Sequence, residues 1–176
     1  MIRFRLCPRE DGSPGGRVRL LREVLEPGLF QAFQLYVRAL SKTSVMQWED
    51  WGHRLTRHND PFAVLIHEKL STMVSEIARR PVKKSYVYLA CYGEGGVVPD
   101  HVDRVQCKYT LDLCLEDSGP PWPLVVDGRP YVFGENEGLF YLGIEQPHHR
   151  VVKPEGKTAH LAFFHFVDAD FSGTLD

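Results

Sequence analysis

The second half of the chain is a succession of short segments with the composition of β-strands. Each segment is rich in aromatic or β-branched residues, and Gly, Pro, Asp and Asn separate one from the next. They read SYVYLACY, CKYTLDLCL, WPLVVDG, RPYVF, GLFYLG and TAHLAFFHFV. Such a series of short strands predicts a β-sandwich or barrel core, which we place at about residues 84–168.

The segment CKYTLDLCL shows which of its residues share a face, because side chains alternate between the two faces of a strand. One face carries Cys107, Tyr109, Leu111, Leu113 and Leu115, and the other carries Lys108, Thr110, Asp112 and Cys114. An apolar face opposite a mostly polar one predicts a half-buried strand.

The first half of the chain, from about residue 20 to residue 80, has a helical period. Apolar residues recur at i, i+3, i+4 and i+7 in LEPGLFQAFQLYVRALSK, which predicts an amphipathic helix. A second helix is predicted to begin after Asp60 and Pro61, a capping residue followed by proline in the first turn, and to end near Pro81. The early segments RFRL and GRVRLL could add strands to the core sheets.

These patterns together predict an α+β protein with supporting helices in its N-terminal half and a core of two β-sheets. The length of 176 residues fits one domain, residues 1–176, better than two small ones. Two sheets that close on each other leave an apolar-lined mouth, where a small ligand can bind.

The composition excludes several classes of partner. Lys and Arg number 21 against 23 Asp and Glu, and this balance argues against a nucleic-acid surface. No apolar run approaches the length of a membrane span and no signal peptide is recognisable, so we expect no membrane partner and a cytoplasmic protein. The four cysteines form no C-x-x-C pair, which favours free thiols over a cysteine-based zinc site.

His101 and Asp103 form an H-x-D pair directly before the strand CKYTLDLCL. On an extended segment, residues i and i+2 point to the same side, so both side chains can reach one metal ion. The alternative is ordinary turn chemistry, in which the aspartate caps a turn. The third ligand of a metal site would come from GIEQPHHRVV, where His148 and His149 follow the predicted strand GLFYLG. Two imidazoles and one carboxylate with open coordination positions suit a non-heme Fe(II) oxygenase.

Segments around these residues resemble the 2-oxoglutarate- and Fe(II)-dependent dioxygenases. YLACYGEGGVVPDHVDRVQCKYTLDL is similar to the first part of a prolyl-hydroxylase-type core, in which a strand ending in tyrosine leads through a Gly-rich turn to H-x-D. DHVDRVQCKYTLDLCL, PWPLVV and YLGIEQPHHRVV, followed by AFFHFVD, resemble small members that read H-x-D-R-x-x-C, P-W-P and Y-x-G-x-E-x-x-H-W-R. The resemblance covers about residues 84–168. It implies a double-stranded β-helix (jelly-roll) core and an oxygenase that uses Fe(II), 2-oxoglutarate and O2, hydroxylates its substrate, and releases succinate and CO2.

Carried over to this chain, the resemblance makes His101, Asp103 and His148 the iron ligands, which would also be the catalytic centre. His148 matches the histidine of H-W-R, whereas His149 stands where those relatives have tryptophan. His148 is therefore the predicted ligand, and His149 is its rival.

The resemblance also implies a cation for the distal carboxylate of 2-oxoglutarate, commonly nine or ten residues after the distal histidine. Lys157 is in that position, directly before TAHLAFFHFV, and Arg150 is the rival anchor. Tyr92 and Tyr109 stand where relatives place a tyrosine near the cosubstrate.

The remaining expectations concern alternatives and residues without a role. A non-catalytic jelly-roll binding module would lack a functional metal site, and a cupin-like metalloenzyme would not need 2-oxoglutarate. Trp48 and Trp51 are predicted to pack in the core or in loops, and His160 and His165 are predicted to lie on opposite faces of the last strand. The substrate is expected to be a small molecule or a peptide, and the oligomeric state is open.

Overall fold

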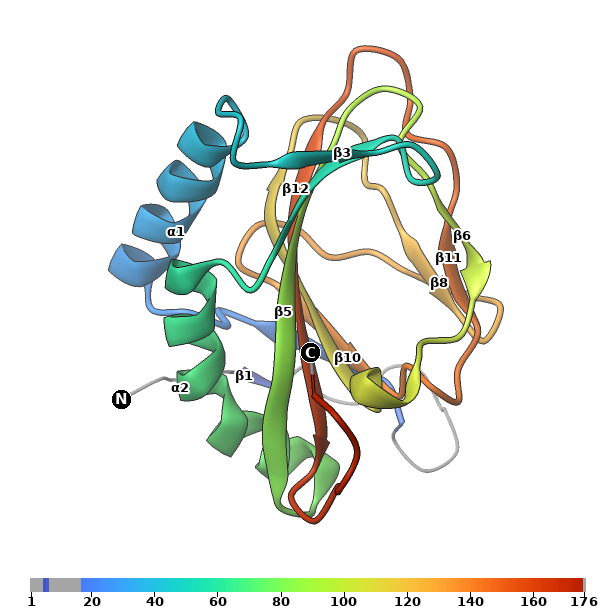
Figure 1. The fold of residues 1–176 in the computed structure, drawn as a ribbon. Helices are drawn as coiled ribbons and strands as arrows, with labels where there is room; N and C mark the ends of the chain where they lie inside the picture. Colours follow the sequence, from blue (N-terminus) through green and yellow to red (C-terminus); the bar gives the residue numbers. More distant parts are fainter. Residues whose placement is uncertain (1–4, 7–16, 176) are drawn as a thin grey trace.

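The computed structural model describes residues 5–6 and 17–175, which form two antiparallel sheets and two helices (Figure 1). The large sheet has eight strands in the order β1-β2-β10-β7-β12-β5-β4-β3, and the small sheet has four in the order β6-β11-β8-β9. The strands of the large sheet are β1 (Arg5–Leu6), β2 (Arg19–Arg22), β3 (Gln47–Glu49), β4 (Arg54–His58), β5 (Val82–Tyr92), β7 (Tyr109–Asp117), β10 (Gly138–Tyr141) and β12 (Ala159–Asp168). Those of the small sheet are β6 (Val98–His101), β8 (Leu124–Val126), β9 (Arg129–Tyr131) and β11 (His148–Arg150).

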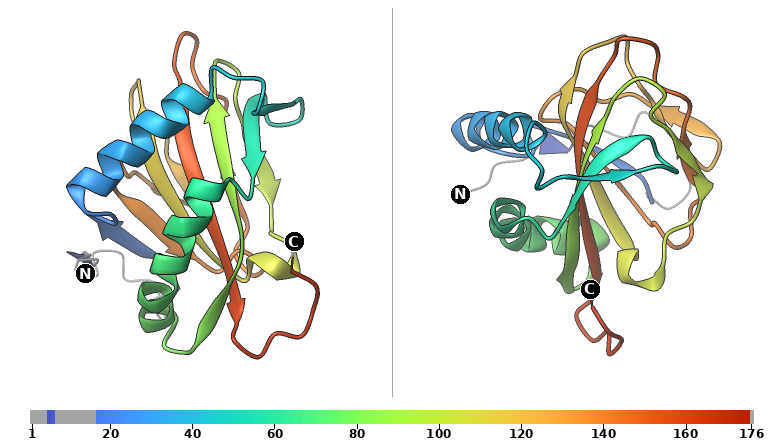
Figure 2. Two further views of the ribbon diagram at one scale, coloured as in Figure 1. Left: turned by 60° about the vertical axis from the view of Figure 1, so that its left-hand side comes forward. Right: turned by 45° about the horizontal axis from the view of Figure 1, so that its top comes forward.

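From β5 onward the chain passes back and forth between the two sheets. β5, β7, β10 and β12 belong to the large sheet, while β6, the β8–β9 hairpin and β11 between them belong to the small sheet. This alternation is the topology of a jelly roll, so the predicted double-stranded β-helix core is confirmed. The two sheets face each other (Figures 1 and 2).

Both predicted helices are present, and they lie against the outer face of the large sheet (Figure 2). Helix α1 spans Pro27–Leu40 and helix α2 spans Pro61–Ala78. At the start of α2 the Asp60 carboxylate accepts hydrogen bonds from the backbone N–H groups of Phe62 and Ala63, which have no partner within the helix. The helix ends at Arg79, which has a left-handed backbone conformation.

The core between the helices and the large sheet is apolar. It is built from the inward sides of both helices and the outward side chains of the central strands, including Phe33, Leu70, Leu111 and Phe164. A second cluster lies between the two sheets and includes Tyr92, Trp122, Tyr141 and Leu161. Strand β7 contributes to both clusters.

Two predictions about the sheets are corrected. The N-terminal half is not helical throughout, because β3 and β4 form a hairpin that extends the large sheet beside β5. Strand β7 is not half-buried: its polar residues Thr110 and Asp112 are fully buried and lie on the side opposite the helices. The prediction that RFRL and GRVRLL add strands is confirmed by β1 and β2.

Trp48 differs from the prediction, whereas Trp51 fits its loop alternative. Trp48 lies on β3 and Trp51 in the turn after it, and their side chains are 57% and 52% exposed. Neither therefore packs in the core.

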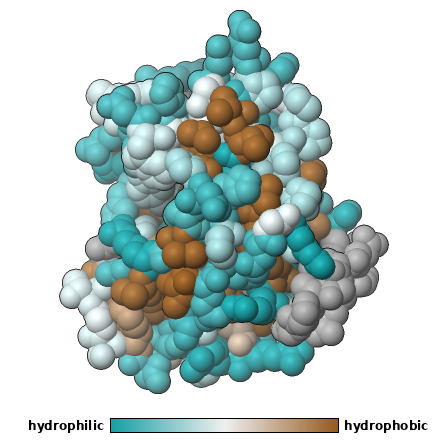
Figure 3. All heavy atoms as spheres, turned by 90° about the vertical axis from the view of Figure 1, so that its right-hand side faces the viewer, coloured by the Kyte–Doolittle hydropathy of each residue, from teal (hydrophilic) through white to brown (hydrophobic). Residues whose placement is uncertain are grey.

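No helix of residues 17–175 lies over the outer face of the small sheet (Figure 1). On the face of the molecule nearest this sheet, hydrophobic areas are interspersed with hydrophilic ones (Figure 3). Within residues 17–175, no helix is long and apolar enough to cross a membrane.

Candidate active site

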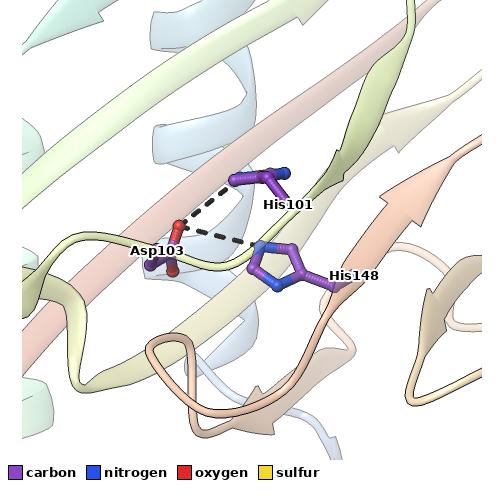
Figure 4. Close-up of side chains that lie close together, drawn as sticks. All are labelled: His101, Asp103 and His148. Atoms are coloured by element: carbon purple, nitrogen blue, oxygen red, sulfur yellow. Dashed lines mark ion pairs between the residues drawn. The ribbon is translucent and has the colours of Figure 1, made fainter.

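His101, Asp103 and His148 converge at one end of the small sheet (Figure 4). His101 ends β6 and His148 begins β11, and the two residues are directly opposite each other in the antiparallel pair. The Oδ1 atom of Asp103 is 3.5 Å from Nε2 of His101 and 3.7 Å from Nε2 of His148. One nitrogen from each ring and one carboxylate oxygen all lie within 4.8 Å of one another, close enough for one metal ion to bind all three.

The two histidines are oriented by hydrogen bonds from their other ring nitrogens. Nδ1 of His101 is 2.7 Å from the carbonyl oxygen of Pro99, and Nδ1 of His148 is 2.9 Å from that of Gln146. A carbonyl oxygen only accepts, so each Nδ1 carries a proton, and in the neutral ring each Nε2 has a lone pair that can bind a metal. Histidines that bind metals have this arrangement.

The pKa values of the three groups follow from the same geometry. In its protonated form His101 donates a hydrogen bond to Asp103, which raises the pKa of His101, whereas burial lowers the pKa of His148. Burial alone would raise the pKa of Asp103, but the hydrogen bond from His101 and the nearby imidazoles give a net lowering. Asp103 is therefore ionised near neutral pH, as a metal ligand must be.

A cavity of about 380 Å³ opens beside these residues. Its deeper wall comes from the inner faces of both sheets, and its rim comes from the β3–β4 hairpin and the loop after β6. The lining comprises Glu49, Trp51, Arg54, Tyr86, Tyr88, Val98, His101, Val102, Asp103, Arg104, Leu124, Tyr141, His148, Arg150, Phe163 and His165. A cavity of this size can hold a small ligand.

Arg150 is buried in this cavity, two residues after His148 and on the same face of β11. Its Nη2 donates to Oδ2 of Asp112 at 2.8 Å, and its Nη1 donates to the carbonyl oxygen of Trp122. Its Nε atom is buried and has no hydrogen-bond partner among the described residues. The guanidinium is thus held in place by Nη1 and Nη2, while the Nε–H is unused.

Tyr141 lines the same cavity, with its ring 4.8 Å from that of His148. Burial raises the pKa of Tyr141 well above its usual value, so the hydroxyl keeps its proton. Arg150 and Tyr141 therefore present a cation and a hydroxyl donor beside the three converging residues.

The other predicted residues lie elsewhere. His149 is on the opposite side of β11, where its Nδ1 is 3.4 Å from Asp100 Oδ1, so the structure brings His148 and not His149 to the site. Lys157 is half-buried, lies beside Gly119, and does not line the cavity. Tyr109 donates from its hydroxyl to Asp168 at 2.8 Å, in the cluster on the helix side. Tyr92 is buried behind the lining, where its hydroxyl accepts a hydrogen bond from Arg54.

Sequence reasoning missed the contribution of the β3–β4 hairpin. The guanidinium of Arg54 is 4.6 Å from the ring centroid of Trp51 and pairs with Glu49. Tyr88 donates to the other carboxylate oxygen of Glu49 at 2.8 Å. The available signal was the turn Asp50-Trp51-Gly52-His53 between two short polar segments, which is typical of a hairpin.

Sequence reasoning also missed His165: it placed this residue on the last strand but gave it no role in the site. It lines the cavity and is buried, and burial lowers its pKa to about 4. Together with Asp103 and Cys107 it forms a second group of potential ligand atoms that lie within 4.8 Å of one another. The two groups of potential ligands share the carboxylate of Asp103.

No protein-family model matches the chain, and no curated protein matches it either. Solved structures do match it. A Pseudomonas putida prolyl-4-hydroxylase has a TM-score of 0.68 and 14% identity, over 86% of this chain and 93% of that one. HygX from Streptomyces hygroscopicus, with nickel, 2-oxoglutarate and hygromycin B bound, has a TM-score of 0.69 and 11% identity, over 89% and 84%.

SnoN, a non-heme alpha ketoglutarate dependent epimerase from nogalamycin biosynthesis, has a TM-score of 0.70 and 10% identity, over 88% of this chain and 77% of that one. Identities this low establish a shared fold only. The chain has the jelly-roll fold of these three enzymes.

Proposed function

We propose that the protein is an Fe(II)- and 2-oxoglutarate-dependent oxygenase with His101, Asp103 and His148 as the iron ligands. The observation that carries this proposal is the convergence of two imidazole nitrogens and one carboxylate oxygen beside a cavity. The set contains no thiolate, so it suits Fe(II) better than a structural zinc ion. Three protein ligands leave positions open for a cosubstrate and O2.

The cavity also fits 2-oxoglutarate. A dicarboxylate needs a cation and hydroxyl donors, and Arg150 offers a buried Nε without a partner among the described residues. Tyr141 supplies the hydroxyl. We therefore favour Arg150 over Lys157 as the anchor, with Tyr141 in the place that Tyr92 and Tyr109 were expected to take.

Iron and 2-oxoglutarate, when bound, supply an oxidation by O2 that yields succinate and CO2. The chain orients the ligands and holds the cosubstrate carboxylate. Hydroxylation of a small molecule or a peptide side chain is the outcome we propose. The similar structures include an epimerase as well as prolyl hydroxylases, so the type of reaction must be determined by identifying the product.

An anaerobic titration with Fe(II) and 2-oxoglutarate tests the proposal, because the ternary complex has a visible charge-transfer band. We expect the band in the wild type and in His149→Ala, whose imidazole lies on the outer face. We expect none in His101→Ala, Asp103→Ala or His148→Ala. Arg150→Met should bind Fe(II) but need much more 2-oxoglutarate.

Two results would contradict the proposal. A wild-type protein that binds Fe(II) but never 2-oxoglutarate would be a cupin-like metalloenzyme, and one that binds neither would be a binding module. The binding-module alternative is disfavoured by the half-buried, ionised Asp103, since a module without metal has no need for a charge there.

A further inference from the structure

The two carboxylate oxygens of Asp103 have different surroundings. Oδ1 faces Nε2 of both histidines. Oδ2 points the other way and accepts a hydrogen bond of 3.0 Å from the hydroxyl of Thr110 on β7. The backbone N–H of Asp103 also donates to the carbonyl oxygen of Gly143 at 2.9 Å.

Thr110 links Asp103 to His165. Its Oγ1 is 3.1 Å from Nδ1 of His165 on the neighbouring strand β12. The ionised carboxylate has no proton, so the threonine hydroxyl must donate to it and accept from Nδ1 of His165. The three side chains thus form a directed chain from His165 through Thr110 to Asp103.

Gly143 closes the other side of the carboxylate. A Cβ at this position would come within 3.0 Å of Oδ2 of Asp103, the carbonyl oxygen of Cys107 and the hydroxyl of Thr110. One of these is backbone, which cannot move aside cheaply. The absence of a side chain at Gly143 therefore makes room for Asp103 in its observed orientation.

We propose that Thr110, His165 and Gly143 are positioning residues that hold Asp103 with a single oxygen toward the metal. The inference rests on the proposed function and adds what fixes the carboxylate. With Oδ2 engaged by Thr110 and packed against Gly143, Asp103 contributes one ligand atom instead of two. If Asp103 rotated and bound through both oxygens, it would occupy a second coordination position of the metal ion. Holding Oδ2 away leaves that position open.

The first test is Ni²⁺ binding by calorimetry without cosubstrate. Thr110→Val keeps the shape and removes the hydroxyl, and we expect its dissociation constant to rise about 10–100-fold, the usual effect of losing an outer-shell partner. Thr110→Ser restores the hydroxyl and should bind Ni²⁺ nearly as the wild type does. Thr158→Val is the matched control, because it removes an exposed threonine hydroxyl that bonds to Ser118.

The second test concerns the other two residues. His165→Asn keeps a donor near the Nδ1 position and should bind Ni²⁺ more tightly than His165→Phe. Gly143→Ala should weaken binding, whereas Gly93→Ala should not, because a Cβ at Gly93 would meet no atom within 4 Å. Thermal unfolding of each variant shows whether it is folded.

The outcomes separate this inference from the proposed function. If folded Thr110→Val binds Ni²⁺ as tightly as the wild type, the positioning role is refuted. The oxygenase proposal would still stand if the wild type binds 2-oxoglutarate. If the wild type binds Ni²⁺ and the variants weaken it as expected, but 2-oxoglutarate never binds, the positioning role stands and the oxygenase proposal falls.

Discussion

The two faces of the large sheet are both buried, yet they have opposite chemistry. The face under α1 and α2 is packed with aliphatic and aromatic side chains. The face toward the small sheet carries the buried polar groups Thr110, Asp112 and His165, and Asp112 pairs with Arg150 of the small sheet. Burying polar and charged groups is costly unless they are paired, so the inner face carries a cost that the helix side largely avoids. On the helix side the buried His67 is an exception.

Strand β7 shows the contrast within one element. Leu111 and Leu113 point to the helices, while Thr110 and Asp112 point between the sheets and meet His165 and Arg150. A purely structural core would be more stable with apolar residues at these positions, since replacing a buried ion pair by packed hydrophobic residues is often stabilising. The polar inner face is thus evidence for a ligand site, and the apolar outer face is the scaffold that holds it.

The largest expected effect comes from breaking the inner ion pair. Arg150→Met should lower the free energy of unfolding by about 3–5 kcal/mol, because it leaves Asp112 charged or protonated without a partner in a fully buried position. The double variant Arg150→Met, Asp112→Leu should regain most of this stability. Urea unfolding measures both.

The same pair separates stability from function. Both variants should bind 2-oxoglutarate much more weakly than the wild type, since the guanidinium is absent in each. A stable double variant that still binds 2-oxoglutarate as the wild type does would show that Arg150 is not the anchor.

A second comparison uses neighbouring residues on β7. Leu111→Ala removes a fully buried side chain on the helix side and should cost about 2–5 kcal/mol of unfolding free energy. Its Ni²⁺ affinity should stay that of the wild type while the protein is folded. Thr110→Val should do the reverse, with a smaller loss of stability and a large loss of affinity. Equal effects of both variants on both measurements would remove the distinction between the faces.

The sequence predicted the architecture because the evidence for it is local. Strand alternation, the Asp60-Pro61 helix start and the turn residues act over a few positions, so they survive without tertiary information. His101 and Asp103 could be paired for the same reason. Strand alternation also places His148 and Arg150 on one face, although which face is inward needed the structure.

The remainder depended on information that spacing does not contain. Alternation along β7 separates two faces, but it does not distinguish a polar face in solvent from one in a cavity. Lys157 was located by counting along the chain, yet it lies in the loop before β12, and a register shift follows between His160 and Leu161. Arg54 was hidden because its short strand lies within a region with a helical period.

A third prediction concerns acid stability. Burial lowers the pKa of His67, on the helix side, to about 3, below the value near 6.5 expected in the unfolded chain. Between these values the unfolded chain binds more protons, so the free energy of unfolding falls as the pH is lowered from 6.5 toward 3, by roughly 1.4 kcal/mol per pH unit for this group. His67→Gln, which can keep the hydrogen bond to the His165 carbonyl oxygen, should show a shallower decline in urea unfolding between pH 7 and pH 5. An unchanged slope would mean that His67 does not titrate on unfolding.

The smallest stability effect is expected at the rim. Trp51 is 52% exposed and covers the guanidinium of Arg54, so Trp51→Ala should cost only about 0.5–1 kcal/mol, the contribution of a partly exposed cation–π contact. Ni²⁺ and 2-oxoglutarate should bind as before, because neither the three converging residues nor Arg150 contacts this ring.

If the rim holds the substrate, Trp51→Ala should raise the KM in substrate-stimulated succinate formation with little change in kcat. Trp48→Ala is the matched control, since Trp48 is similarly exposed but does not line the cavity, and equal KM changes in both variants would argue against a substrate role for Trp51.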